Sequence, residues 1–120
     1  MKVLVCEDER LVGRAIQIVL EKAGYDVKLA VDGNEAMECI ENEVFSAIIV
    51  DVHLPYASGL EIIGQLRKEK DDKVPIIVVT AISDNNIQRQ AQLLGANKYL
   101  LKPYDPKQLV NVVHELLNNN

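Results

Sequence analysis

The chain alternates between short apolar runs and longer amphipathic stretches. Each of five short runs has the composition of a β-strand: Lys2–Cys6, Asp26–Ala30, Ala47–Val50, Ile76–Val79 and Lys98–Leu101. Five stretches with helical periodicity lie between and after them: Arg10–Ala23, Asn34–Ile40, Leu60–Lys70, Ile87–Leu94 and Gln108–Leu117. Strands that alternate with helices of about 10–15 residues predict consecutive βαβ units.

Two of the predicted strands have no polar position at all. Ala47–Val50 and Ile76–Val79 are continuously apolar and rich in β-branched residues, as expected for strands buried on both faces of a parallel sheet. The first amphipathic stretch instead has a helical stripe with spacings of three and four residues, formed by Leu11, Ala15, Ile18, Val19 and Lys22. Right-handed crossovers between such units give a doubly wound, three-layer α/β sandwich.

Turn and capping residues agree with these boundaries. Gly24 and Gly95 follow helical stretches at the position where a C-terminal glycine is favoured. Asp32-Gly33 predicts a turn before the second helix. Asp105-Pro106 combines an N-cap acceptor with a proline at the first helical position, which indicates where the last helix begins.

Length and composition limit the class of protein. The chain has 120 residues, of which 48% are hydrophobic and 26% charged, so we expect one domain over residues 1–120 that buries roughly two thirds of its unfolded surface. No apolar run approaches the roughly 18 residues of a membrane helix. The formal charge of −5 argues against direct nucleic-acid binding through phosphates. Cys6 and Cys39 read as reduced thiols of a cytoplasmic protein.

Polar side chains collect directly after four of the five strands. Glu7 and Asp8 follow the first strand, Asp51 the third, Thr80 the fourth and Lys102 the fifth. In open α/β sheets, sites form outside the carboxyl ends of the strands. Individually, Asp51 could cap a loop and the acids could complement a helix dipole. Together they describe carboxylates suited to Mg²⁺, with a lysine and a hydroxyl that could receive a phosphate group.

Four sequence blocks together resemble the receiver domain of two-component response regulators over essentially the whole chain. They are Val3–Glu9, Ile48–Pro55 with Gly59, Val78–Ala81, and Gly95–Pro103. The resemblance implies a flavodoxin-like (βα)5 fold, with a five-stranded parallel sheet in the order 2-1-3-4-5.

The resemblance also assigns chemical roles. Asp51 is the expected phosphoacceptor. The expected Mg²⁺ ligands are Glu7, through water, together with Asp8, Asp51 and the backbone carbonyl of His53. Lys102 and the Thr80 hydroxyl are expected to neutralise and bind the phosphoryl oxygens.

Backbone N–H groups near His53 and Ala81 complete this expected phosphoryl site. Thr80 and Tyr99 are the expected switch pair, in which Tyr99 turns inward when Thr80 moves toward the phosphoryl group. The Lys102–Pro103 peptide bond is expected to be cis, again by resemblance.

Three positions depart from the commonest form of the family. Glu7 stands where aspartate is frequent, and Ser58 replaces an aspartate but can still cap the third helix. His53 lies at the mouth of the expected site. Its imidazole could act as a pH-sensitive gate or orient an attacking water. The alternative interpretation, that His53 is a solvent-facing loop residue, is favoured. His114 is expected to be an ordinary surface residue.

Three functions remain open on the sequence. The leading hypothesis is a signalling switch that is phosphorylated by a sensor histidine kinase or phosphotransfer protein and catalyses only its own phosphorylation and autodephosphorylation. A receiver-like module that never turns over phosphate is the second. The third, an FMN binder or Mg²⁺-dependent phosphohydrolase on the same fold, is disfavoured, because Glu7-Asp8-Glu9 would repel FMN phosphate and Asp51 follows the wrong strand for the hydrolase.

The output partner is expected on the face formed by the fourth helix, fifth strand and fifth helix. Candidate residues there are Ile87, Gln90, Lys98, Tyr99, Val110 and Val113. A phosphorylation-dependent homodimer is compatible with this face. The chain could be a stand-alone regulator or the N-terminal receiver of a longer one.

Overall fold

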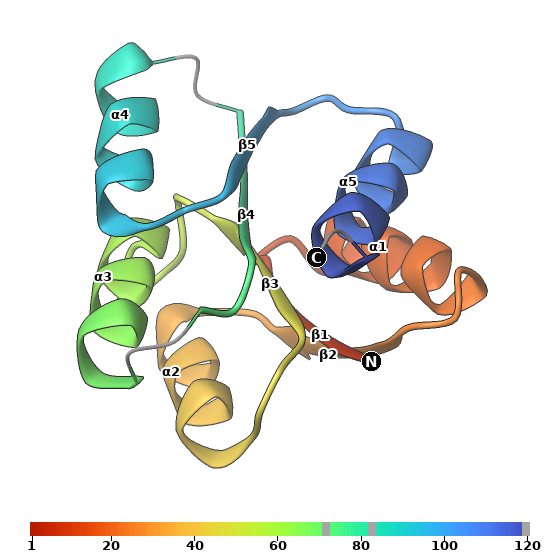
Figure 1. The fold of residues 1–120 in the computed structure, drawn as a ribbon, viewed down its shortest axis with the longest axis horizontal. Coiled ribbons are helices and arrows are strands. Elements are labelled where there is room, and N and C mark those ends of the chain that lie inside the picture. The colour runs from red at the N-terminus through yellow and green to blue at the C-terminus, as the bar shows by residue number, and fades with distance from the viewer. Residues whose placement is uncertain (71–72, 82–83, 119–120) are drawn as a thin grey trace.

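A computed structural model describes residues 1–70, 73–81 and 84–118 and contains one parallel sheet between two layers of helices (Figure 1). The strands are β1 (Lys2–Cys6), β2 (Asp26–Ala30), β3 (Ala47–Asp51), β4 (Ile76–Thr80) and β5 (Lys98–Leu101). Their order is β2-β1-β3-β4-β5, and every neighbouring pair is parallel. The predicted fold class and strand order are therefore confirmed.

The helices divide unequally between the two faces of the sheet. Figure 1 shows α1 and α5 on one side, and α2, α3 and α4 on the other. Their bounds are α1 Arg10–Lys22, α2 Gly33–Asn42, α3 Gly59–Lys70, α4 Asn85–Leu94 and α5 Pro106–Asn118. These agree with the predicted stretches to within two residues at each end.

Side chains near the ends of the helices fix most of these boundaries. Asp32 Oδ1 accepts from the Glu35 backbone N at 2.8 Å, and Ser58 Oγ accepts from Glu61 N at 3.2 Å. Asp105 Oδ1 accepts from Lys107 N at 2.9 Å. These bonds satisfy N–H groups that have no partner within the helix, so short-range sequence signals were sufficient to locate the starts of these three helices.

The central strands are buried at every position, and their side chains alternate between two apolar cores. The core beneath α2, α3 and α4 includes Leu4, Cys6, Ile48, Val50, Ile76 and Val78. The core beneath α1 and α5 includes Val3, Val5, Ile49, Ile77 and Val79. This two-residue period confirms the prediction that these strands are covered on both faces.

The buried face of α1 differs from the predicted stripe. The buried residues of this helix are Gly13, Ile16 and Leu20. Leu11 is 88% exposed and Ile18 is 40% exposed. Apolar residues occur at helical spacing on both sides of α1, so periodicity alone could not choose between them. Packing against the sheet and α5 decided the orientation.

Two residues of α5 also differ from expectation. Val113, a candidate for the output face, is fully buried in the core beneath α1 and α5. His114 is half-buried rather than an ordinary surface residue. Its Nδ1 is hydrogen bonded to the Tyr25 hydroxyl, and the two rings lie 5.2 Å apart. Tyr25 is 89 positions away in the sequence, so no local pattern revealed this contact.

None of the helices in the described part of the chain combines the length and apolar character that a membrane span requires.

Candidate functional site

The polar residues predicted to gather at one edge of the sheet do so because the strands end almost level. In the sheet register, Cys6 of β1 pairs with Val50, and Asp51 of β3 pairs with Val79. Thr80 of β4 pairs with Leu101. The residues at or just after these carboxyl ends are Glu7, Asp8, Asp51, Thr80 and Lys102, so parallel pairing alone brings them together.

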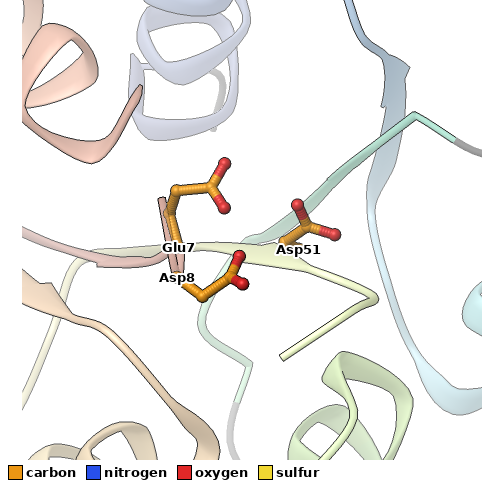
Figure 2. A group of neighbouring side chains, drawn as sticks. All are labelled: Glu7, Asp8 and Asp51. Carbon is orange, nitrogen blue, oxygen red and sulfur yellow. The ribbon is translucent and has the colours of Figure 1, made fainter. Parts of the chain in front are cut away.

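Three acidic side chains converge at this edge (Figure 2). Glu7, Asp8 and Asp51 each offer one carboxylate oxygen, and these oxygens lie within 4.8 Å of one another. Asp8 is exposed, whereas Glu7 is 3% and Asp51 6% exposed. Among the described residues, Glu7 Oε2 is buried and has no hydrogen-bond partner. A buried unpaired oxygen beside two further carboxylates fits a hard divalent cation such as Mg²⁺.

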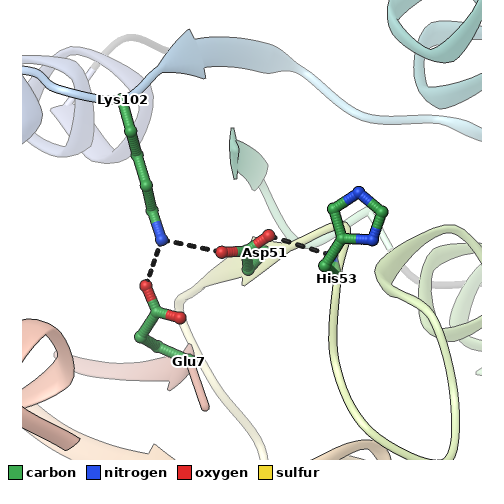
Figure 3. Close-up of polar contacts among 4 residues, drawn as sticks. All are labelled: Glu7, Asp51, His53 and Lys102. Carbon is green, nitrogen blue, oxygen red and sulfur yellow. Dashed lines mark hydrogen bonds and ion pairs between the residues drawn. The ribbon is translucent and has the colours of Figure 1, made fainter. Parts of the chain in front are cut away.

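Lys102 links two of these acids (Figure 3). Its Nζ donates to Asp51 Oδ2 at 2.7 Å and also to Glu7 Oε1. Burial lowers the pKa of Lys102, but the bonds to Asp51 and Glu7 outweigh burial and raise that pKa above its ordinary value. The two acids therefore favour the protonated ammonium form of Lys102.

The pKa of Glu7 shifts upward, whereas a nearby lysine lowers the pKa of an exposed acid. Burial raises its pKa, the bond to Lys102 opposes this, and nearby Asp51 adds to the increase. The net direction of the Glu7 pKa is upward, because burial of the carboxylate outweighs its interactions with Lys102. A further positive charge at the edge would relieve this excess of negative charge.

Asp51 is also held by the backbone that follows it. The His53 backbone N donates to Asp51 Oδ1 at 2.9 Å, and the dashed line in Figure 3 ends on this backbone. The His53 residue as a whole is exposed. Both carboxylate oxygens of Asp51 therefore have a donor, one from Lys102 and one from His53.

The remaining predicted residues lie on β4, β5 and the segments after them. Thr80 is fully buried, and its carbonyl accepts from the Lys102 backbone N at 2.8 Å. Ala81 is exposed. The Lys102–Pro103 peptide bond is cis, as expected from the resemblance.

Tyr99 lies farther from the edge, opposite Val78 in the β4–β5 register. It is half-buried and packs against the core beneath α2, α3 and α4. Burial raises the pKa of its phenol, with smaller contributions from Asp84 and Asp51. The structure thus brings Lys102 into direct contact with Glu7 and Asp51. Tyr99 lies two residues before Leu101 on β5, farther from the carboxyl end of the strand.

An apolar groove beside the site was not predicted. It has a volume of about 640 Å³ and reaches Lys102. Leu11 and Ala15 of α1 line one side, and Pro103 and Tyr104 line the other. The available sequence signal was the apolar stripe of α1, because its members Leu11, Ala15 and Val19 line this groove.

A family model describing the response regulator receiver domain matches residues 3–114. Among curated relatives, the alkaline phosphatase synthesis transcriptional regulatory protein PhoP of Bacillus subtilis is 36% identical over 119 residues, covering 99% of this chain and 49% of the relative. The response regulator ArlR of Staphylococcus saprophyticus is 34% identical, covering 97% and 52%. The chain therefore spans about half the length of these relatives.

Solved structures agree with the sequence relatives. The receiver domain of the Francisella response regulator 1452 has a TM-score of 0.92 and 29% identity, with 98% of this chain and 96% of that chain covered. The receiver domain of a Pseudomonas aeruginosa sensor histidine kinase has a TM-score of 0.88 and 28% identity, with 98% of each chain covered. That structure holds a magnesium ion coordinated in its active-site cleft.

Proposed function

Because this chain belongs to the family of response regulator receiver domains, we propose that it is a phosphoacceptor switch of a two-component, His-Asp phosphorelay. Asp51 receives the phosphoryl group from a phosphohistidine on a sensor histidine kinase or phosphotransfer protein. The observation that carries the proposal is the position of the Asp51 carboxylate, which is 6% exposed and held between the Lys102 ammonium and the His53 backbone N.

The transfer step requires positioning more than covalent assistance. One Asp51 carboxylate oxygen attacks phosphorus, and the new O–P bond forms as the P–N bond to histidine breaks. The departing imidazole nitrogen keeps the electron pair and takes a proton from solvent. Lys102 already contacts Asp51 at 2.7 Å. Its ammonium is therefore close enough to bind the phosphoryl oxygens once they carry the negative charge.

Mg²⁺ fits the acidic edge of this proposed site. Glu7, Asp8, Asp51 and the backbone carbonyl of His53 would hold it, and its charge would neutralise the transferred phosphoryl group. The unpaired, buried Glu7 Oε2 supports this assignment. The magnesium ion in the related Pseudomonas aeruginosa receiver domain supports it independently.

In this proposal, the phosphoryl group is removed from Asp51 without a second enzyme. Water attacks phosphorus, the Asp51 O–P bond breaks, and the products are inorganic phosphate and the free carboxylate. The protein thus catalyses only its own phosphorylation and autodephosphorylation. The Thr80 hydroxyl and N–H groups near His53 and Ala81 bind the phosphoryl oxygens while the modification lasts.

Phosphorylation then shifts a conformational population rather than building a new fold. Thr80 moves toward the phosphoryl group and Tyr99 turns inward, which changes the face formed by α4, β5 and α5. Leu93 of α4 and Leu101 of β5 are exposed apolar side chains that could contact an output partner or a second copy of the chain. Relatives named as transcriptional regulators support an output in gene expression by a longer protein, without direct DNA contact by this acidic domain.

The test is intact-mass spectrometry after incubation with acetyl phosphate and Mg²⁺. We expect one phosphoryl adduct, lost in Asp51→Asn and in the presence of EDTA. A folded protein that binds Mg²⁺ but forms no adduct would contradict the proposal and favour a phosphate-independent interaction module.

A further inference from the structure

One exposed tyrosine has a backbone conformation that is costly for its residue type. Tyr56 has φ = 74°, and it is the one non-glycine residue with positive φ in the described ranges. The left-handed region costs an L-residue with a side chain about 1–2 kcal/mol. The Tyr56 residue is 81% exposed, so packing within this chain offsets little of that cost.

The surrounding loop forces this conformation. The Pro55 carbonyl accepts from Ala57 N at 2.9 Å, which closes a tight three-residue turn around Tyr56. The same carbonyl accepts from Gly33 N at 2.9 Å, and a Cβ on Gly33 would lie 2.5 Å from Ala57 Cβ. The turn therefore packs against the start of α2, and the hydrogen bonds from Ala57 N and Gly33 N to the Pro55 carbonyl fix its backbone.

Both ends of the loop are also fixed by hydrogen bonds at or next to Asp51, the proposed phosphoacceptor. It leaves β3 at Asp51, whose Oδ1 accepts from His53 N, and it returns where Gly59 N donates to the Val52 carbonyl at 2.9 Å. Leu54 is buried at 9% exposure, which fixes the middle of the loop. Tyr56 is thus a fixed, outward-facing aromatic at the same sheet edge as Asp51.

We propose that Tyr56 is a specificity-determining contact for the protein that delivers the phosphoryl group to Asp51. This inference rests on the proposed phosphoacceptor function. A donor protein must bring its phosphohistidine against the edge from which this loop projects. A rigid aromatic ring with a hydroxyl loses little entropy on contact and is a frequent centre of binding energy in interfaces. Glycine or asparagine would suit the backbone better, so an exposed ring at this position points to a contact outside this chain.

Three substitutions separate the ring from the backbone. Tyr56→Gly and Tyr56→Asn remove the ring with residues that tolerate positive φ, while Tyr56→Phe keeps the ring and removes the hydroxyl. Val44→Asn is the matched control, because Val44 is 91% exposed and precedes β3 at the opposite sheet edge. Urea unfolding establishes that each variant folds, and we expect a higher midpoint for Tyr56→Gly than for the unaltered protein.

Two phosphodonors are then compared. Acetyl phosphate needs no protein contact, so we expect all variants to react within about twofold of the unaltered protein. The protein donors are the histidine kinase cores of the source organism, autophosphorylated with ATP, and the fastest of them is carried forward. With it, Tyr56→Gly and Tyr56→Asn are expected to lower kcat/KM by about tenfold or more, mainly through KM. Tyr56→Phe and Val44→Asn are expected to stay within about threefold.

Other outcomes overturn the inference. Equal rates for all variants with the protein donor mean that Tyr56 contacts no donor. If acetyl phosphate modifies the unaltered protein but no kinase core does, the proposed transfer from a phosphohistidine has failed, and this inference fails with it. A parallel loss with acetyl phosphate means that Tyr56 acts by holding the loop. A defect confined to self-association of the phosphorylated protein assigns the ring to another interface. If the unaltered protein takes no phosphoryl group even from acetyl phosphate, the proposed function itself has failed.

Discussion

A Cβ atom on Gly59 would lie 2.3 Å from the backbone carbonyl oxygen of Asp51. The first residue of α3 therefore touches the strand end that carries the candidate phosphoacceptor. No side chain fits in this contact without moving one of the two backbones. The position of Asp51 and the packing of α3 are thus coupled through a single glycine.

Replacing Gly59 with alanine is expected to lower the free energy of unfolding by about 1–3 kcal/mol, as overpacking does in tight interiors. It should also slow phosphorylation by acetyl phosphate, because Asp51 must shift. Gly64→Ala is the matched control in the same helix. Its Cβ would lie 3.5 Å from Leu94, so alanine should instead stabilise the helix by about 0.5–1 kcal/mol. Urea unfolding checks both, and equal effects of the two substitutions would refute the steric argument.

Removing the Lys102 ammonium is expected to destabilise the protein in a pH-dependent way. Lys102→Met leaves Glu7 and Asp51 buried together without their cation, at a cost of about 3 kcal/mol near neutral pH. The pKa of Glu7, already raised, rises further. The folded state then binds more protons than the unfolded state, so the free energy of unfolding of the variant increases as pH falls.

Urea unfolding at about pH 8 and about pH 5.5 checks this prediction. The deficit of Lys102→Met relative to the unaltered protein should shrink at the lower pH. Lys98→Met is the control, because Lys98 is exposed and lies 3.9 Å from Glu115, a surface pair worth at most about 1 kcal/mol. A deficit that is the same at both pH values would contradict the charge argument.

Thr80 is expected to couple the phosphoryl site to Tyr99. In protein labelled with 3-fluorotyrosine, Mg²⁺ and beryllofluoride should shift the Tyr99 fluorine resonance, which Tyr99→Phe assigns. Thr80→Ala removes the hydroxyl and should reduce this shift by about half or more, whereas Thr80→Ser keeps the hydroxyl and should preserve it. An unreduced shift in Thr80→Ala would show that Tyr99 responds by another route.

His53 is expected to affect loss of the phosphoryl group more than its gain. The His53 backbone N already binds Asp51 at 2.9 Å, and alanine leaves that bond intact. His53→Ala should therefore reach a similar phosphorylated yield but change the autodephosphorylation rate by about twofold to tenfold. Decay followed by mass spectrometry between about pH 6 and 8 checks this. Identical, pH-independent decay in both proteins would make His53 a simple solvent-facing residue.

The two cysteines are expected to differ in reactivity toward iodoacetamide. Cys6 is fully buried, and burial raises its thiol pKa far above the ordinary value. Cys39 is half-buried, with a smaller increase from burial. Because the thiolate is the reacting species, Cys39 should be alkylated at least about tenfold faster, and Cys6 only on unfolding. Peptide mapping with and without urea measures this, and equal labelling of native protein would show that β1 opens locally.

The sequence by itself determined the helices and strands, their succession along the chain and the residue types at the site. Strands such as Ala47–Asp51 are recognisable because an apolar, β-branched run has few other ways to be buried. Caps such as Asp32 and Asp105 act within four residues. The carboxyl-edge rule then brings Asp51 and Lys102 together once the strands are parallel.

Tertiary structure alone decided which face of α1 is buried, that His114 pairs with Tyr25, and that Tyr56 is held at positive φ. It also decided that one lysine bridges Glu7 and Asp51. Each of these depends on contacts between segments far apart in the chain, where two local arrangements of similar energy compete. Local propensity cannot separate such alternatives, because the difference in free energy comes from the partner surface that only the folded chain supplies.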